Sequence, residues 1–421
     1  MNTVVIVLAG GSNSRFQPLR DKTLLPIMGR PLLAHHLDAL ALAGFRDVIV
    51  VANARTEGRV RSLLDAYRGR GKLVEVVVQL EAVGMGDAVL TAARVLGESG
   101  PRPLLITQAH DVVEPDLFKR LAEACARPDV ADGLVTGRRV SEYFPAGYLR
   151  VDDDGRLRGL VEKPGEGNEP SDLIKLVFDW HRDSEALFTA IRRQYGRPIA
   201  TDDHYERALA DLFTRKRYGL VPYEGEWHPI KYPWHVLDVM DFYLARAGTE
   251  PSIEGVRILP GAHVVGPCYI GPGAVVGDGC LVRGSMIGEN TEVGYGCEVA
   301  RSWVGSNVHL HHSYVGDTVV DDHAGLAFGT VTANWPFYPP PVRSTADGER
   351  LKTGREKFGA IIGARVRTGI GVLLYPGVKV GYGAFIGPGV VVTGDIDARR
   401  LVVVKQELDV RENPFVGEEG Q

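Results

Sequence analysis

Cysteine is scarce in this chain: four of its 421 residues are cysteines, Cys125, Cys268, Cys280 and Cys297, and their spacing does not match a metal-ligand pattern. So few cysteines argue against a disulfide-stapled secreted scaffold. Three of them occupy small-residue positions of a repeat described below. We therefore interpret them as reduced thiols that pack inside the protein.

Long apolar runs are also missing. No run reaches the roughly 18 residues that a membrane span needs, and Met1 leads into a strand and a glycine-rich loop instead of a charged segment with a cleavage site. We expect a cytoplasmic protein with no membrane partner. The net charge is −5 with acids and bases interspersed, which argues against nucleic acid as the main partner. Any anion-binding site must then be local.

The N-terminus carries the most informative motif. A strand-like run from Thr3 to Leu8 leads into Ala9-Gly10-Gly11-Ser12-Asn13-Ser14-Arg15, and Lys22 follows. Small side chains let backbone N–H groups approach an anion, while Arg and Lys balance its charge. The pattern predicts a nucleoside triphosphate site; the alternative is a tight turn between a strand and a helix. Neither the dinucleotide fingerprint nor the P-loop fits, because both require glycines or a Gly-Lys-Ser/Thr that this segment lacks.

The segment from Leu8 to Pro26 resembles the signature loop of the sugar-1-phosphate nucleotidylyltransferases. That loop reads Leu-Ala-(Ala/Gly)-Gly-x-Gly-Thr-Arg, with a Lys seven residues after the Arg, as Lys22 follows Arg15 here. Asn13 and Ser14 replace the usual Gly and Thr. Asn tolerates a left-handed backbone better than most residues, so we expect the turn to be kept.

The first half of the chain has the pattern of an α/β domain. Short apolar runs alternate with amphipathic stretches, which is typical of a mostly parallel, Rossmann-like sheet with helices on both faces. The expected strands are 4–8, 47–51, 73–80 and 103–107, and the expected helices are 32–43, 56–67, 86–96 and 116–126. Ligands in such sheets bind beyond the carboxyl ends of the strands, where the glycine loop begins.

Four further segments resemble the same family, in the same order: Gln79 to Val89, Ala109-His110-Asp111, Gly147 to Pro164, and Trp227 to Leu237. The resemblance implies a nucleotide site, a magnesium ion and a sugar-phosphate site. It assigns nucleotide binding to Leu8, Ala9, Gly10, Gly11, Gln79 and Gly84; catalysis to Arg15 and Lys22; metal binding to Asp111 and His235; and sugar-phosphate binding to Gly147, Glu162 and Lys163.

Simpler interpretations exist for three of these residues. Asp111 would only cap the turn after a strand, Glu162 with Lys163 would be a solvated strand end, and Gln79 would satisfy an edge strand.

Some positions depart from the family pattern. Lys175 and Val177 stand where the family has Asn and Gly on the strand that lines the sugar, which leaves the sugar open. His235 stands where a second Mg²⁺-binding Asp is expected, and a neutral imidazole is a poorer ligand for this hard cation. His110 adds bulk beside Asp111.

The second half shows a six-residue period. Aliphatic residues recur at Val264, Ile270, Val276 and Val282; the period slips, resumes, and returns from Ile362 to Val392. Such hexapeptides stack as coils of a left-handed parallel β-helix, in which no coil can bury its own face alone. We expect a nucleotidylyltransferase domain at 1–232, a linking helix within 233–252, a β-helix at 253–397 and a tail at 398–421. A Pro-rich, charged stretch at 334–357 should project as a loop.

The second half also resembles a family, the bifunctional sugar-1-phosphate nucleotidylyltransferase and amino-sugar N-acetyltransferase enzymes of archaeal type, similar to N-acetylglucosamine-1-phosphate uridylyltransferases. The matching segments are His311 to Asp317, Gly329 to Asn334 and Lys352 to Gly363. Acetyl transfer needs a base to free the amine lone pair, which suits a His near neutral pH. The resemblance implies His311 as that base and an acetyl-transfer site of Tyr314, Asn334, Lys357, Ala360 and Thr368. Alternatively, His309, His311 and His312 are an idle exposed cluster.

The sequence therefore predicts an enzyme that transfers a nucleotidyl group from an NTP, UTP or dTTP by expectation, to a sugar-1-phosphate or amino-sugar-1-phosphate. The resemblance implies Mg²⁺ as cofactor, acetyl-CoA as co-substrate, acetylation before nucleotidyl transfer, and a homotrimer or a dimer of trimers. Two alternatives stay open. Either the β-helix only oligomerises or regulates a nucleotidylyltransferase, or an acetyltransferase carries a degenerate nucleotide-binding domain.

Overall fold

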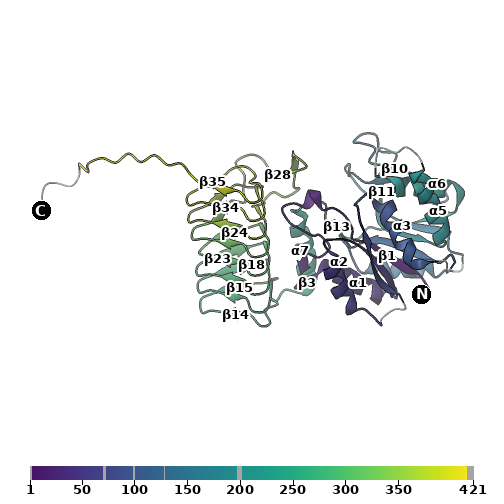
Figure 1. Ribbon diagram of the computed structural model, residues 1–421, viewed down its shortest axis with the longest axis horizontal. Coiled ribbons are helices and arrows are strands. Elements are labelled where there is room, and N and C mark those ends of the chain that lie inside the picture. Colours follow the sequence, from purple (N-terminus) through teal and green to yellow (C-terminus); the bar gives the residue numbers. More distant parts are fainter. Residues whose placement is uncertain (1, 70–72, 98–99, 128, 197–201, 415–421) are drawn as a thin grey trace. The chain divides into compact units, whose positions relative to one another are not determined.

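The computed structural model describes residues 2–69, 73–97, 100–127, 129–196 and 202–414. The chain divides into two compact units, Met1–Tyr243 and Leu244–Gln421, and each is described by itself (Figure 1). No helix in the described part of the chain is long and apolar enough to cross a membrane.

The first unit is built on a nine-stranded mixed sheet, with β1 near its centre between β4 and β6. The sheet runs β10-β9-β11-β6-β1-β4-β5, and β8 joins β11 to β12. Its strands are β1 (Val4–Leu8), β4 (Asp47–Asn53), β5 (Val74–Gln79), β6 (Leu104–Gln108), β8 (Gly133–Arg139), β9 (Gly147–Val151), β10 (Leu157–Glu162), β11 (Leu173–His181) and β12 (Tyr218–Pro222). Two small sheets pair β2 (Pro26–Ile27) with β3 (Arg30–Pro31), and β7 (Asp111–Val113) with β13 (Trp227–Pro229).

The expectation of a mostly parallel sheet is only half right. The pairings of β1 with β4 and β6, and of β4 with β5, are parallel, whereas β11 is antiparallel to β6, β8 and β9. The antiparallel half includes the hairpin β9–β10, which needs no crossover helix. The sheet is therefore mixed.

Helices cover both faces of this sheet because alternate residues of its buried strands point to opposite sides. In β1, Val5 and Val7 pack in one apolar cluster with α1, α2 and α4, while Val4, Ile6 and Leu8 pack in another with α3, α5 and α6. The helices are α1 (Leu32–Leu42), α2 (Glu57–Asp65), α3 (Met85–Leu96), α4 (Asp116–Cys125), α5 (Ser184–Tyr195), α6 (His204–Arg215) and α7 (His235–Ala247), with a 3₁₀ turn η1 (Ser14–Phe16). The expected strands and helices all form, within one or two residues of their predicted bounds.

The second unit is a parallel β-helix of three sheets, as the hexapeptide period predicts (Figure 1). One sheet stacks β14 (Arg257–Ile258), β17 (Val275–Val276), β20 (Glu292–Val293), β23 (His309–Leu310), β26 (Gly325–Leu326), β31 (Arg367–Thr368), β34 (Phe385–Ile386) and β36 (Leu401–Val402). The second stacks β15 (His263–Val265), β18 (Leu281–Arg283), β21 (Glu298–Ala300), β24 (Tyr314–Gly316), β27 (Val331–Thr332), β32 (Leu373–Leu374) and β35 (Val391–Val392). The third stacks β16 (Tyr269–Ile270), β19 (Met286–Ile287), β22 (Trp303–Val304), β25 (Val319–Val320), β30 (Ile361–Ile362) and β33 (Lys379–Val380).

The periodic aliphatic residues line the interior of this coil stack. Ile270, Val276 and Val282 are fully buried, and each recurs in register one coil later. The three cysteines of the repeat, Cys268, Cys280 and Cys297, are buried free thiols in the same core, so the packing interpretation is confirmed.

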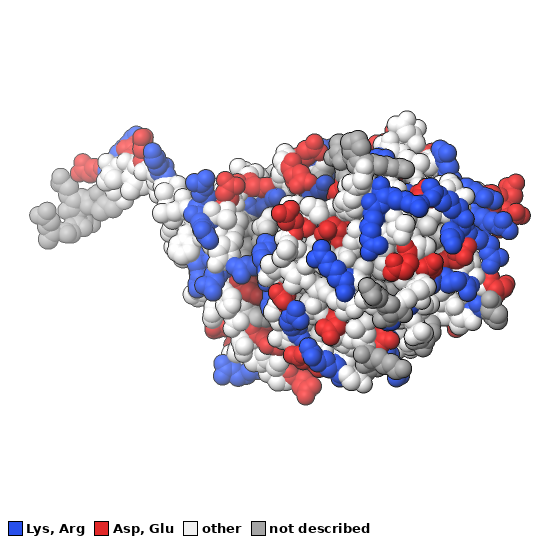
Figure 2. Space-filling view, turned by 45° about the vertical axis from the view of Figure 1, so that its right-hand side comes forward, with Lys and Arg blue, Asp and Glu red and all other residues white. Residues whose placement is uncertain are grey.

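Between β27 and β30 the stretch that breaks the period leaves the coil and forms a hairpin of β28 (Arg343–Ala346) and β29 (Glu349–Lys352). Acidic and basic side chains are interspersed over the face drawn in Figure 2, as the small net charge suggests.

Candidate functional site

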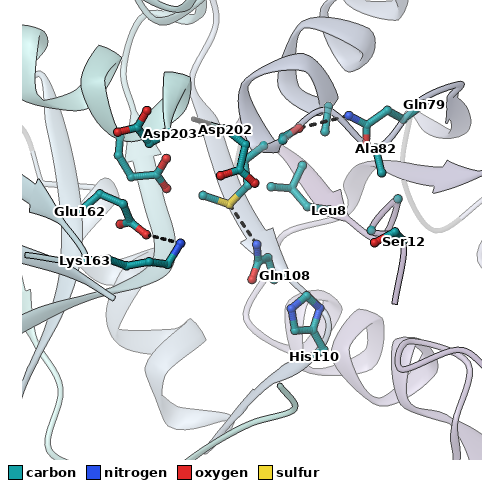
Figure 3. Close-up of a pocket in the computed structure, with 16 residues that line it drawn as sticks. Leu8, Ser12, Gln79, Ala82, Gln108, His110, Glu162, Lys163, Asp202 and Asp203 are labelled. Atoms are coloured by element: carbon teal, nitrogen blue, oxygen red, sulfur yellow. Dashed lines mark hydrogen bonds and ion pairs between the residues drawn. The ribbon is translucent and has the colours of Figure 1, made fainter. Parts of the chain in front are cut away.

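A cavity of about 330 Å³ opens beyond the carboxyl end of β1 (Figure 3). It joins the glycine loop at one end to Glu162 and Lys163 at the other. Its lining is polar and mixed in charge, and comes from loops that are distant in sequence: Leu8, Gly10, Gly11, Ser12, Gln79, Ala82, Gly84, Met85, Ala88, Gln108, His110, Glu162, Lys163, Asp202, Asp203 and Glu206. Most of the predicted nucleotide and sugar-phosphate residues thus face one space. The lining does not include the predicted residues Ala9, Arg15, Lys22, Asp111 and Gly147.

The glycine loop is shaped by close packing at Gly10. A side chain there would bring its Cβ to 2.7 Å from Gln79 Oε1, whereas the same addition at Gly11 meets nothing within 4 Å. Ala9 is buried at the end of the strand, and its N–H donates to the Val51 carbonyl. Asn13 adopts the left-handed conformation, φ 59°, as expected for the residue that replaces Gly.

Gln79 ends the edge strand β5 and is only 4% exposed. Its amide Nε2 donates to the Gly84 carbonyl at 3.1 Å and to Asp87 Oδ2 at 2.9 Å. Both amide hydrogens are therefore used to hold the loop before α3. In this arrangement Gln79 positions Gly84, whose φ of 102° suits glycine, and presents its carbonyl oxygen toward Gly10.

The predicted phosphate-binding residues share one electrostatic environment. Asp111 is 7% exposed at the start of β7, and burial raises its carboxyl pKa to about 6 although Lys231, Lys175 and Lys22 oppose the shift. Burial lowers the pKa of the Lys22 ammonium to about 8, against the attraction of Asp111 and with repulsion from Arg15. A multiply charged anion would find several cations here with little water to screen them.

Lys231 is a member of this group that the sequence analysis did not name. Its Nζ donates to the Pro145 carbonyl at 2.9 Å and lies 3.7 Å from the centre of the Phe144 ring. Burial lowers the pKa of Lys231 to about 8, and Asp111, Lys163, Glu162 and Arg15 act on it electrostatically. Its position between the two ends of the site follows from the pairing of β13 with β7, which places Pro229 opposite Asp111.

At the other end of the cavity Gly147 and Glu162 are paired across β9 and β10. A Cβ on Gly147 would lie 3.0 Å from Glu162 Oε2, so glycine leaves room for this carboxylate. Lys163 Nζ pairs with Glu162 Oε1 at 2.9 Å (Figure 3). The Lys163 backbone is left-handed, φ 44°, a strained conformation for a lysine, which is more common at functional sites than elsewhere.

Lys175 does not line the cavity, contrary to the expectation for its strand position. Its Nζ donates to Asp179 Oδ2 at 2.8 Å, and the two side chains are 3% and 0% exposed. Tyr205 also donates its hydroxyl to Asp179 Oδ2, at 2.9 Å. The ammonium is therefore held in a buried network beneath the cavity. Val177, the other unusual residue of the strand, is partly buried and is also absent from the lining.

The two histidines near Asp111 differ in their surroundings. His110 lines the cavity, and burial together with nearby Lys22 lowers its imidazole pKa to about 3, so the ring is neutral. His235 begins α7, and its Nδ1 accepts the Lys231 backbone N–H at 3.1 Å. No group of three or more His, Cys, Asp or Glu that could hold a metal ion occurs among the described residues. Metal binding by His235 stays a prediction.

The β-helix carries a pocket of about 390 Å³ that contains His311 and Thr368. Both lie among side chains of neighbouring coils that include Glu292, His309 and Arg367. The His311 ring is exposed and packs edge-on against Phe328, with ring centres 5.7 Å apart.

Tyr314 and Asn334 meet beside this coil. Asn334 Nδ2 donates to the Tyr314 hydroxyl at 3.2 Å and to Asp317 Oδ2 at 2.5 Å, and Arg301 binds Asp317 through two bonds of 2.7 Å. Lys357 Nζ lies 5.6 Å from the centre of the Trp335 ring. These contacts fix Asn334 and Tyr314 relative to one another.

Ala360 is placed less favourably for a ligand. It is fully buried, its N–H donates to Thr318 Oγ1 at 3.2 Å, and its carbonyl accepts the Val319 N–H at 3.0 Å. Both backbone groups are thus used inside the coil. The Thr368 hydroxyl bonds to that of Thr330 at 2.8 Å but still borders the pocket.

Comparison with known proteins agrees with this geometry. Residues 4–180 match the nucleotidyl transferase family model. The chain is 29% identical over 415 residues to the bifunctional sugar-1-phosphate nucleotidylyltransferase/acetyltransferase of Sulfurisphaera tokodaii, covering 88% of this chain and 92% of that protein. It is 28% identical over 449 residues to the bifunctional protein GlmU of Methanococcus vannielii, covering 96% and 99%. The resemblance expected from the sequence is confirmed: the chain is a homologue, over most of its length, of the bifunctional sugar-1-phosphate nucleotidylyltransferase/acetyltransferase proteins, and it contains a nucleotidyl transferase domain.

Proposed function

We propose that the first unit transfers a nucleotidyl group from an NTP to a sugar-1-phosphate, releasing pyrophosphate. The observation that carries this proposal is the single cavity that joins the glycine loop to the Glu162–Lys163 pair. A sugar-phosphate oxygen bound at one end can attack the α-phosphorus of a nucleotide bound at the other. The P–O bond to the β-phosphate breaks, and pyrophosphate leaves. The activities in the relatives' names support this reaction class.

The residues around Asp111 would supply the charge stabilisation that such a reaction needs. Arg15 is exposed at the loop and would hold the leaving pyrophosphate, while Lys22 would neutralise the α-phosphoryl group. One buried carboxylate fits Mg²⁺, which is often held by one or two carboxylates together with substrate phosphates and water. Asp111 would hold this ion, and Mg²⁺ bound there offsets negative charge on the phosphates.

Substrate selection at the two ends is assigned to different groups. Gly10, Gly11 and the loop held by Gln79 would receive the nucleotide, and UTP or dTTP is the expected substrate. Gly147, Glu162 and Lys163 would bind the sugar phosphate, with Glu162 accepting hydroxyl hydrogens and Lys163 facing the phosphate.

We further propose that the β-helix transfers an acetyl group from acetyl-CoA to an amino sugar. The amine nitrogen forms a bond to the thioester carbonyl carbon, His311 takes the amine proton, and the bond to sulfur breaks to release CoA. Tyr314 and Asn334, which are hydrogen-bonded to each other, would bind and orient the amino sugar together with Lys357. Thr368 would border acetyl-CoA, whereas Ala360 would act by shaping the coil, because its backbone groups are already bonded. Such a site would be completed by a neighbouring copy in a homotrimer or a dimer of trimers. NTPs and acetyl-CoA both occur in the cytoplasm, where we place the enzyme.

The test measures pyrophosphate release and acetyl incorporation by the full chain with Mg²⁺, four NTPs and a panel of hexose- and hexosamine-1-phosphates. We expect Asp111→Asn to abolish pyrophosphate release and to leave acetyl transfer intact, and His311→Gln to do the reverse. Matched controls are Asp116→Asn on the exposed start of α4 and His263→Gln on the exposed first coil.

Each failure has a separate meaning. Pyrophosphate release without any acetyl transfer would reduce the β-helix to a structural or regulatory module. Acetyl transfer without pyrophosphate release would mean that the first unit is degenerate.

A further inference from the structure

The glycine loop is held from outside the cavity by residues that follow from the strand next to β1. β4 ends at Asn53, whose amide Nδ2 donates to the Gly11 carbonyl at 3.3 Å. Two residues later, Arg55 Nη2 donates to the Ser12 carbonyl at 3.0 Å. Gly11 and Ser12 line the cavity, whereas Asn53 and Arg55 do not. Both bonds therefore turn carbonyls of the loop away from the space that the NTP would occupy.

The orientation of these two carbonyls sets the orientation of the next two N–H groups. The Gly11–Ser12 and Ser12–Asn13 peptide bonds are trans, and in a trans peptide the C=O and the following N–H point in opposite directions. The Ser12 N–H thus points away from Asn53, and the Asn13 N–H points away from Arg55. Neither N–H has an acceptor within the described part of the chain. Successive unpaired N–H groups beside a cavity favour an anion.

The side-chain amide of Asn53 has a fixed orientation. Its Oδ1 accepts the Arg55 N–H at 3.0 Å, the Thr56 N–H at 3.1 Å and the Thr56 hydroxyl at 3.2 Å, which closes the turn before α2. Because the oxygen is used by this turn, the amide nitrogen faces the loop. One side chain thus orders both the approach to α2 and a carbonyl of the glycine loop.

We infer that Asn53 is a positioning residue for nucleotidyl transfer: it holds the Gly11 carbonyl outward, so that the Ser12 N–H faces the phosphates of the NTP. The inference rests on the proposed function of the first unit. Asn53 does not touch the substrate and acts through the loop backbone. Without its hydrogen bond the Gly11–Ser12 peptide is free to rotate and must be ordered when the anion binds, which lowers the affinity.

Two substitutions separate the amide hydrogen bond from the other properties of Asn53. Asn53→Asp keeps an acceptor for the turn before α2 but places a carboxylate oxygen against the Gly11 carbonyl, and Asn53→Ser removes the donor without adding charge. We expect Asn53→Ser to raise KM for the NTP about 3- to 10-fold, the usual effect of losing one hydrogen bond, and Asn53→Asp to raise it at least as much. KM for the sugar-1-phosphate should stay within about twofold. Initial rates of pyrophosphate release by the full chain with Mg²⁺ measure both constants.

Asp183→Ser is the matched control. Like Asn53, Asp183 accepts the N–H three residues further on, that of Ala186 at 3.1 Å, but it precedes α5 and does not line the cavity. It should change neither KM. A rise in Asn53→Asp alone would point to the added charge, and a rise in Asn53→Ser alone to the turn before α2; either result overturns the inference. Equal rises in both KM values overturn it as well, because Asn53 would then support only the fold.

Equilibrium binding of inorganic triphosphate separates this inference from the proposed function. If no substrate pair gives pyrophosphate, the proposed function fails, but calorimetric titration of inorganic triphosphate with Mg²⁺ still tests Asn53. Binding that weakens about 3-fold or more in both Asn53 variants, and not in Asp183→Ser, supports the inference. No binding by the unchanged protein, or equal binding by all the variants, overturns it. Melting temperatures close to that of the unchanged protein show that the variants are folded.

Discussion

At the scale of single residues, some of the charged residues around Asp111 can be recognised from sequence motifs, and others are brought there only by the fold. Arg15, Lys22 and Asp111 belong to recognisable motifs, and the structure places Lys22 and Asp111 within electrostatic reach of one another. Lys231 joins them only because β13 pairs with β7. Lys231 lies within the Trp227 to Leu237 segment that resembles the family, but the motif does not single it out, since its Pro145, Phe144 and Asp111 neighbours all come from distant segments.

His36 is a residue whose protonation makes the stability of the fold depend on pH. It is buried in α1, its Nε2 lies 3.2 Å from the Thr107 hydroxyl, and burial lowers its pKa from 6.5 to about 3. Between these two values the unfolded chain binds a proton that the folded chain does not, so stability falls as the pH drops through that window. Above about pH 6.5 this residue causes no loss of stability. At pH 5 it lowers the free energy of unfolding by about 2 kcal/mol relative to pH 7.

We therefore expect His36→Gln to unfold in urea with a smaller difference between pH 7 and pH 5 than the unchanged protein. His263→Gln, on an exposed first-coil residue, is the control and should keep the full difference. His181, also buried with a pKa lowered to about 3, keeps part of the acid sensitivity in the His36 variant. An identical pH difference in both variants would show that His36 does not contribute.

At the scale of elements, the glycine loop contains two glycines, Gly10 and Gly11, that look equivalent in sequence but differ in their surroundings. Gly10→Ala places a Cβ against Gln79 Oε1, whose amide is already held by Gly84 and Asp87. The added atom must displace this amide or the loop, so we expect KM for the NTP to rise about tenfold, the equivalent of roughly 1.4 kcal/mol.

Gly11→Ala is the matched control, because a Cβ there meets nothing within 4 Å. Initial rates at varied NTP concentration measure both variants. If both raise KM equally, the direct approach of the loop backbone to the nucleotide matters more than its packing on Gln79.

Elements are also where the sequence was most informative. Apolar periodicity predicts β1, α1 and α4 because their burial follows from local spacing, and the hexapeptide period predicts the β-helix for the same reason. The antiparallel half of the sheet was not predicted, since strand direction is set by connections and partners. The interpretation of Lys175 failed similarly: its partners Asp179 and Tyr205 are brought together by a strand irregularity and a distant helix.

At the scale of the whole molecule, the outer face of the β-helix changes character along its length. Outward positions of the last coils are apolar and exposed, among them Leu373, Phe385, Val391 and Leu401. The first coils show residues such as His263 and Arg257 at the corresponding places. Leu373 and Val391 stack on adjacent coils of one sheet and form an apolar stripe, and Phe385 and Leu401 stack in the same way on a different sheet. An exposed apolar stripe of this kind is typical of an association surface. This supports the expected trimer, in which identical copies bury the stripe against one another.

The trimer has a direct test in solution. Light scattering on the unchanged protein should give three times the chain mass of 45.8 kDa, or six times it for a dimer of trimers. Leu373→Glu combined with Val391→Glu places charge on two adjacent strands of the stripe, β32 and β35, and should lower the mass to that of one chain. Val265→Glu, at a 52% exposed apolar residue of the first coil in the same sheet, is the control and should leave the mass unchanged. If acetyl transfer needs residues from two copies, it should be lost in the double variant while pyrophosphate release continues. A double variant that keeps the mass of the unchanged protein would show that the stripe is not the interface.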